Sequence, residues 1–484
     1  MNYLSTRGGS KLSSSFDALM KGLSDDGGLY IPEKLEKIDF TKYEIENFKY
    51  TDYAKKIISS IFDDIDKKDL FEQIDLAYES FEKDILPIKD LDDIFYMELF
   101  HGQTFAFKDF ALSLLPRLIS LALKNKNIDK DILILTATSG DTGSAALYGF
   151  KNVDRTKIIV FYPNKGISEI QKRQMTSVDG NNTYAVGIEG NFDDAQSNLK
   201  LIFNDKEFKE YLDQKGYILS SANSINIARL VPQIVYYFYT YNTLLKEGKI
   251  KEGEKVSVCV PTGNFGNILA AFLARKMGLK INNLICASNK NNVLTDFINT
   301  GIYDIKRDFY ITNSPSMDIL VSSNLERFLY YQLGEDPEIV KKLMEDLKAK
   351  GEYRVDKDKL KSIYAYSFDD GDTLKEIKRV YDKYNYLIDT HTAVASLAAN
   401  KYLKDHDEKV MLASTASAFK FAHSTNQALG IDYNDQLDAI DCLEKATNIL
   451  ADKRFKEILN KKEKQNYNVD KSEIKKIIKE IINW

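Results

Sequence analysis

A lysine in an apolar neighbourhood is the first residue whose type and setting suggest chemistry. The segment HGQTFAFKDFALS surrounds Lys108 with Phe105, Phe107 and Phe110. An unpaired ammonium is costly to bury, and both apolar neighbours and a helix N-terminus lower the pKa of an amine. Lys108 is therefore a candidate nucleophile or base. The alternative is a lysine whose stem lies on the surface while its ammonium reaches water.

Two glycine-containing turns are candidate anion-binding sites. TATSGDTGSAA contains Ser139 and Thr142, and PTGNFGNILAA follows the apolar run VSVCV and contains Gly263 and Gly266. Backbone N–H groups at a turn that opens a helix bind phosphate or carboxylate. The second turn is neither a Walker A loop nor a dinucleotide-binding fingerprint. A helix cap in the first segment and a plain strand-to-helix turn in the second remain alternatives.

A third polar group lies in SANSINIARL, residues 221–230, which brings Asn223, Ser224 and Arg229 close together in sequence. A guanidinium with an amide and a hydroxyl suits a second phosphate or carboxylate. The alternative is a helix cap followed by a surface arginine.

Alternating strands and helices must position these residues. DILILTAT precedes GSAALYGF, and KIIVFYP precedes ISEIQKRQM; the same unit recurs at KVSVCVPTGNFGNILAA and KVMLASTASAFKFAHS. This alternation predicts a parallel sheet with covering helices, and such sheets bind ligands at the carboxyl ends of their strands. Residues 1–95 lack a strand followed by a Gly-rich loop and are expected to form an accessory domain. The charge-rich end of the chain, residues 441–484, is expected to be a helical tail.

Composition narrows the class of protein. The 484 residues carry a net charge of −5, only four histidines and three widely spaced cysteines. The spread of basic residues argues against nucleic acid, and the histidine and cysteine spacings argue against a metal site or a disulfide framework. No run of about 18 apolar residues could span a membrane. We expect a cytoplasmic protein without a membrane partner.

Read together, these segments resemble the threonine synthase family, whose enzymes use pyridoxal phosphate. HGQTFAFKDF, TATSGDTG, SANSINIARL, PTGNFGN, SPSMDI and THTAVA occur in the family's order, and KGLSDDGGLYIPE is similar to its opening region. The resemblance covers roughly residues 1–430. It implies an α/β fold of type II with two open, mostly parallel sheets covered by helices, plus an N-terminal domain. The catalytic region would then be residues 96–440, with a small mobile subdomain at about 135–235.

The resemblance also implies roles for the candidate residues. Lys108 would bind pyridoxal 5′-phosphate covalently and later move protons. Asp141 would face the cofactor's phenolic oxygen, and Thr415 its pyridine nitrogen. The cofactor phosphate would be held by Gly263, Asn264, Phe265, Gly266 and Asn267. The substrate would be bound by Ser139 near its carboxylate and, at its phosphate, by Thr142, Asn223, Ser224 and Arg229.

The implied reaction is the conversion of O-phospho-L-homoserine and water into L-threonine and phosphate, the last step of threonine biosynthesis. The protein would act as a monomer or homodimer. Two departures from the family pattern are Gln103, where many relatives have proline, and STASAFKFA, which lacks a His-Pro pair. We expect His101 and His391 either to line the site or to be structural.

The same motifs also suit functions other than threonine synthesis. A phospholyase that releases 2-oxobutyrate, or another fold type II lyase such as a serine/threonine dehydratase, would use the same scaffold. A non-catalytic protein could keep the phosphate loops without the chemistry. A nucleotide-dependent dehydrogenase is disfavoured because neither glycine turn has the dinucleotide fingerprint.

Overall fold

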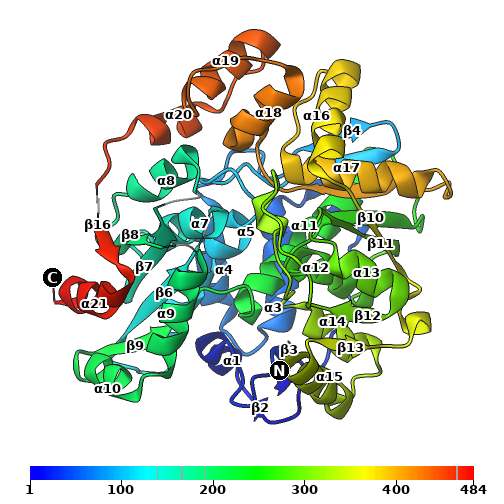
Figure 1. Ribbon diagram of the computed structural model, residues 1–484. Helices are drawn as coiled ribbons and strands as arrows, with labels where there is room; N and C mark the ends of the chain where they lie inside the picture. The colour runs from blue at the N-terminus through cyan, green and yellow to red at the C-terminus, as the bar shows by residue number, and fades with distance from the viewer. Residues whose placement is uncertain (139, 165–166, 191, 465–466, 484) are drawn as a thin grey trace.

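The computed structural model describes residues 1–138, 140–164, 167–190, 192–464 and 467–483. Two sheets lie side by side, and helices α5, α11 and α12 lie between them (Figure 1). The N-terminal region, in blue, is at the bottom of this view, and α18 to α20, in orange, are at the top. None of the helices in the described ranges is long and apolar enough to cross a membrane.

The larger sheet has six strands in the order β14-β11-β10-β15-β5-β4. All neighbours are parallel except the edge strand β4, which is antiparallel to β5. Every residue of β10 is buried, as expected of a strand covered by helices on both faces. The strands are β4 Ile88–Leu91, β5 Ile94–Glu98, β10 Val256–Pro261, β11 Ile281–Ser288, β14 Ile363–Ser367 and β15 Val410–Ser414.

The smaller sheet has five strands, all parallel, in the order β16-β8-β7-β6-β9. Its strands are β6 Asp131–Ala137, β7 Thr156–Pro163, β8 Thr183–Glu189, β9 Tyr217–Ser220 and β16 Tyr467–Asp470. β16 comes from the end of the chain, where we expected only helix. The short alternating segment Tyr-Asn-Val-Asp pairs with the edge strand β8, and α21 then packs its isoleucines on the same sheet.

The N-terminal region consists of a three-stranded antiparallel sheet and four helices. Its elements are β1 Tyr3–Ser5, β2 Lys11–Leu12, α1 Ser15–Lys21, β3 Tyr30–Pro32, α2 Lys42–Asn47, α3 Tyr50–Ile61 and α4 Lys67–Tyr78. Apolar residues of α3 and α4 are buried in the core that also contains α11 and α12. β4 belongs to the larger sheet although it precedes residue 95.

Helices cover both sheets and supply the remaining secondary structure. Those before the last third of the chain are α5 Asp109–Leu112, α6 Leu115–Asn125, α7 Asp141–Phe150, α8 Glu169–Thr176, α9 Phe192–Asn204, α10 Lys206–Gln214, α11 Ile227–Lys246, α12 Gly266–Lys276 and α13 Val293–Thr300. The later ones are α14 Leu325–Gln332, α15 Pro337–Lys350, α16 Asp370–Tyr384, α17 Thr390–Leu403, α18 Ala422–Leu429, α19 Asp438–Thr447, α20 Lys453–Asn460 and α21 Ile474–Ile482. A two-stranded antiparallel sheet of β12 Ile302–Asp304 and β13 Glu352–Arg354 lies beside α13 and α15. Four 3-10 turns are η1 Pro315–Met317, η2 Lys357–Leu360, η3 Ala418–Phe421 and η4 Lys471–Glu473.

After Lys108 the chain forms two helices, α5 and α6, instead of one continuous helix. Ser113 and Leu114 separate them. Pro116 stands in the first turn of α6, where proline needs no hydrogen-bond donor, so it starts a helix instead of kinking one. α7 packs closely on α5, because a Cβ at Gly149 would lie 2.0 Å from the carbonyl oxygen of Leu112. Glycine at this position therefore fixes how the Lys108 segment meets the smaller sheet. The expected fold, two open and mostly parallel sheets covered by helices, is confirmed.

Candidate active site

A cavity of about 570 Å³ contains the predicted site residues. It lies where β6, β10 and β15 end, at the carboxyl edges of both sheets, as expected for parallel sheets. Ser139 lies outside the described residues. The other residues predicted to bind cofactor or substrate all line this cavity: Lys108, Asp141, Thr142, Asn223, Ser224, Arg229, Gly263, Asn264, Phe265, Gly266, Asn267 and Thr415.

Lys108 directly precedes α5, and its side chain is only 11% exposed. The surface-lysine alternative is therefore wrong. Its Nζ donates to Ser316 Oγ at 3.3 Å and lies 3.6 Å from Asp141 Oδ2. Burial lowers the pKa of Lys108 below its ordinary value; Asp141 opposes this shift, and the positive charges of Lys420 and Arg229 add to it. The amine is thus held dry and more easily deprotonated than a surface lysine.

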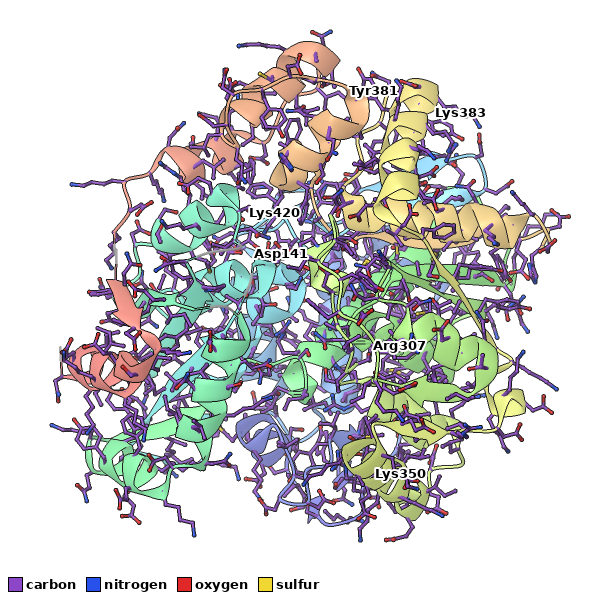
Figure 2. The ribbon with its side chains drawn as sticks, in the orientation of Figure 1. Asp141, Arg307, Lys350, Tyr381, Lys383 and Lys420 are labelled. Carbon is purple, nitrogen blue, oxygen red and sulfur yellow. The ribbon has the colours of Figure 1, made fainter. Side chains whose placement is uncertain are left out.

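Asp141 opens α7 and is the central anion of the cavity wall. Lys420 Nζ lies 3.0 Å from Asp141 Oδ1, and the two residues are close together between the sheets in Figure 2. Gln171 Nε2 donates to the same oxygen at 3.1 Å, and Ser316 Oγ donates to Oδ2 at 3.2 Å. Burial alone would raise the pKa of Asp141, but Lys420 and Lys108 hold it well below its usual range. The carboxylate is therefore ionised.

The glycine turn joins β10 to α12. Phe265 has the left-handed conformation, with φ at 62°, and its buried ring packs on Phe328, so only its backbone can face a ligand. A Cβ at Gly263 would lie 2.7 Å from the carbonyl oxygen of Ser316. The first N–H groups of a helix have no acceptor within the helix. The turn therefore presents the first N–H groups of α12 at the cavity, and a side chain at residue 263 would collide with the backbone of Ser316.

Asn267 anchors this turn to the neighbouring helix. Its Oδ1 accepts hydrogen bonds from Tyr236, at 2.7 Å, and from Tyr237, both on α11. Its Nδ2 is buried and has no partner among the described residues. An anion acceptor at the turn would satisfy that donor.

Arg229 lies in the first turn of α11 and is 5% exposed. Asn226 caps this helix by accepting from the N–H of Ala228 at 2.9 Å. The helix cap of the alternative interpretation is therefore present, but its surface arginine is not. Arg229 Nη1 donates to the carbonyl oxygen of Ala222 at 2.7 Å, and its buried Nε has no partner in the described part of the chain. Burial lowers the pKa of Arg229 to about 10, so it remains a cation at neutral pH.

The loop before α11 is held by α14. Asn324 Nδ2 donates to the carbonyl oxygen of Ser224 at 3.2 Å, and its N–H donates to that of Asn264 at 3.0 Å. Arg327, which is fully buried, donates to Asn324 Oδ1 at 2.6 Å and to the carbonyl oxygen of Ile225 at 2.6 Å. The two phosphate-binding candidates, around residues 224 and 264, are therefore connected through one asparagine.

Thr415 and His391 complete the wall opposite the smaller sheet. The carbonyl oxygen of Thr415 accepts from the N–H of Phe107 at 2.9 Å, which places Thr415 beside the Lys108 segment. His391 Nδ1 is 2.7 Å from Asp389 Oδ2, and Nε2 accepts from the N–H of Ser316 at 3.2 Å. This pattern assigns the proton to Nδ1. His391 therefore lines the cavity and orients the segment that carries Ser316.

His101 is not part of the cavity lining. Its Nε2 lies 2.8 Å from Glu98 Oε2 and its Nδ1 lies 3.1 Å from Glu82 Oε2. We expected His101 either to line the site or to be structural, and these contacts support the structural role.

Sequence reasoning missed three residues that contact Asp141: Gln171, Ser316 and Lys420. Ser316 lies in the segment SPSMDI, but a serine at that position gave no indication of a contact with Lys108. Lys420 did carry a signal, because AFKFA places a lysine between two phenylalanines as AFKDF does around Lys108. An apolar-flanked lysine is the pattern that singled out Lys108.

These residues fit a phosphorylated aldehyde cofactor such as pyridoxal phosphate. The cavity offers a buried amine, N–H donors at the glycine turn and a hydroxyl at Thr415. Arg229 supplies a further cation in the same cavity.

Comparisons with known proteins point the same way. The family described as "Threonine synthase N terminus" matches residues 2–78, and the family described as "Pyridoxal-phosphate dependent enzyme" matches residues 87–415. Threonine synthase-like 1 of Homo sapiens is 40% identical over 445 residues, which are 87% of this chain and 59% of that protein. The chain thus spans about three fifths of that relative's length.

Threonine synthase of Eremothecium gossypii is 37% identical over 491 residues, covering 92% of this chain and 94% of that one. The crystal structure of PLP-bound threonine synthase from Brucella melitensis superposes with a TM-score of 0.87 at 34% identity, covering 100% of this chain and 98% of that chain. The relatives therefore include proteins matched over nearly their full length.

Proposed function

The chain belongs to the threonine synthase family of pyridoxal-phosphate-dependent enzymes, and from this premise we propose that it converts O-phospho-L-homoserine and water into L-threonine and inorganic phosphate. The observation that carries the proposal is Arg229, a buried cation in the same cavity as Lys108, whose Nε has no partner among the described residues. A buried cation that no anion pairs is costly, and a bound phosphate would supply that anion.

We propose a definite set of residues as the holders of the cofactor. Pyridoxal phosphate would be held by Lys108, by the turn from Gly263 to Asn267 and by Thr415, and when bound it supplies an electron sink for carbanions next to the substrate amine. Thr415 presents a neutral hydroxyl, which does not enforce protonation of a pyridine nitrogen as a carboxylate would. This favours elimination and replacement over transamination.

Lys108 is the proposed proton carrier. Its Nζ is held by Ser316 and lies beside the ionised Asp141, so the amine is positioned by two groups and shielded from bulk water. A buried amine with a lowered pKa can accept a proton from the substrate's Cα and Cβ and return it later. Water adds at Cβ, and we assign the matching proton transfers to Lys108 as well.

Arg229, Thr142, Asn223 and Ser224 form the proposed pocket for the substrate phosphate. The bond that breaks joins Cγ to the phosphate oxygen, so negative charge grows on the departing phosphate. A fixed guanidinium in a site with little water stabilises that charge without reorganisation. The connection of this pocket to the glycine turn through Asn324 keeps the two phosphate groups at a fixed separation.

The test is product analysis with the purified chain, pyridoxal phosphate and O-phospho-L-homoserine. We expect threonine and inorganic phosphate in equal amounts, and neither product from Lys108→Ala. Both threonine synthase and threonine synthase-like 1 occur among the relatives, so 2-oxobutyrate is measured in the same reaction. Phosphate with 2-oxobutyrate and no threonine would assign the cavity to a phospholyase instead. A cytoplasmic location is proposed with this activity, supported by three free thiols.

A further inference from the structure

Lys420 is a buried ammonium that the proposed reaction does not use. It belongs to η3, which follows β15, and its side chain is completely buried. Its Nζ lies 3.0 Å from Asp141 Oδ1 and donates to the carbonyl oxygen of Thr104 at 2.8 Å. Lys420 is not among the residues that line the cavity, and it reaches the cavity wall through Asp141.

Asp141 therefore stands between two lysines. Lys420 approaches one carboxylate oxygen at 3.0 Å, and Lys108 lies 3.6 Å from the other. Gln171 and Ser316 each donate to one of the same two oxygens. The carboxylate is thus fixed in orientation as well as in charge.

The order of charges has a consequence for Lys108. A single buried carboxylate beside an amine favours the ammonium form, which cannot act as nucleophile or base. A second cation on the far side of that carboxylate opposes this effect. Among the residues that the structure describes, the other titratable groups near the pair are Arg229, which also disfavours the ammonium, His391, and the carboxyl groups of Asp109 and Asp318.

We propose that Lys420 is a positioning residue that compensates the charge of Asp141 and so keeps the amine of Lys108 uncharged and reactive. The proposal rests on the proposed function in one respect, the assignment of Lys108 as the amine that binds pyridoxal phosphate. Lys420 also fixes the carbonyl of Thr104, whose N–H and hydroxyl donate to Asp109 at 2.8 and 2.6 Å. It thereby holds both the carboxylate and the segment that leads to Lys108.

The test measures uptake of pyridoxal phosphate by the cofactor-free full chain as a function of pH. Uptake is monitored by the absorbance of the bound cofactor, and the pH midpoint of uptake is compared between variants. The variants are Lys420→Met, Asp141→Asn and the double variant. For Lys420→Met we expect the pH midpoint of uptake to move up by about one unit or more, because Asp141 is no longer compensated. Asp141→Asn should move it down, and the double variant should return it close to the wild-type value.

Lys56→Met is the matched control. Lys56 also pairs with one carboxylate, Glu44 at 2.7 Å, and donates to one carbonyl, that of Asp39 at 2.8 Å, but it lies in the N-terminal region. Its midpoint should equal that of the wild type. The contrary result is that Lys420→Met takes up pyridoxal phosphate more slowly by the same factor at every pH, with an unchanged midpoint. That result would overturn the proposal and make Lys420 a structural residue.

The other variants keep the proposal testable if Lys420→Met does not fold. An unchanged midpoint in Asp141→Asn would also contradict the proposal, because this variant removes the carboxylate charge that Lys420 is proposed to compensate. These outcomes are separate from the proposed activity. A wild-type protein that takes up pyridoxal phosphate but makes no threonine would refute the activity and leave the comparison of midpoints intact.

Discussion

Replacing Arg229 with methionine should separate ligand binding from folding. The shift in the pKa of Arg229, from 12.5 to about 10, corresponds to about 3 kcal/mol of unfavourable burial at neutral pH. Methionine removes that cost but also removes the hydrogen bond to Ala222, which contributes about 1.5 to 3 kcal/mol. The two changes nearly cancel. We expect the free energy of unfolding without ligand to change by about 1 kcal/mol or less, whereas truncating an ordinary core residue costs about 2 to 5 kcal/mol.

Binding should respond very differently. The free Nε of Arg229 would make at least one charge-assisted hydrogen bond to phosphate, contributing about 1.5 to 3 kcal/mol. Its loss should raise the KM for O-phospho-L-homoserine by about 10- to 100-fold. In thermal unfolding, inorganic phosphate at about 100 times its Kd stabilises a protein by about 2.7 kcal/mol, and Arg229→Met should lose most of that stabilisation.

Arg275→Met is the matched control for this prediction. Arg275 also donates to a carbonyl, that of Asn282 at 3.1 Å, and burial lowers its pKa, but it lies outside the cavity. The control should keep the wild-type response to phosphate. If Arg229→Met unfolds several degrees lower without ligand and still responds fully to phosphate, then the arginine supports the fold and the anion-site assignment fails.

Two further predictions concern the glycine turn and the loop before Lys108. Gly263→Ala should weaken binding of pyridoxal phosphate by at least about 10-fold in equilibrium titrations, because its Cβ would lie 2.7 Å from the carbonyl oxygen of Ser316. Gly371→Ala, whose Cβ would meet only the Asp369 carboxylate at 3.2 Å, should bind as the wild type does; equal weakening in both would contradict the steric reason. Burial lowers the pKa of His101, but the carboxylates of Glu98 and Glu82 outweigh it and raise the pKa above its ordinary value. The stabilisation from His101 should therefore be complete below about pH 6.5 and lost as pH rises through the folded-state pKa. Denaturant unfolding should show His101→Gln to be destabilised more at acidic than at alkaline pH, and a difference independent of pH would count against this.

The sequence predicts the fold well, and those predicted site residues that the structure describes lie around one cavity, for physical reasons. Strand-helix alternation is a local pattern, and the carboxyl edges of parallel strands bring the following turns together. The apolar neighbours of Lys108 do bury it, and the turn from Gly263 to Asn267 does open α12.

What the sequence did not predict depends on contacts between distant segments. β16 forms by pairing with the edge of β8, and its four alternating residues are too short a pattern to predict a strand within a charge-rich tail. Pro116 begins a helix because the chain breaks at Ser113 and Leu114. Arg229 could not be placed inside from SANSINIARL alone, since its burial depends on packing around α11.

The identity of the reactive lysine is the point on which the mechanism depends, because two buried lysines, Lys108 and Lys420, contact the same carboxylate. The measurement is to load the full chain with pyridoxal phosphate, fix the cofactor to its lysine by borohydride reduction, and map the modified peptide by mass spectrometry. We predict that the cofactor is found on Lys108 in the wild type and in Lys420→Met, and that Lys108→Ala carries none. Modification of Lys420, or of another lysine in the wild type, would contradict the assignment of Lys108 and the mechanism built on it.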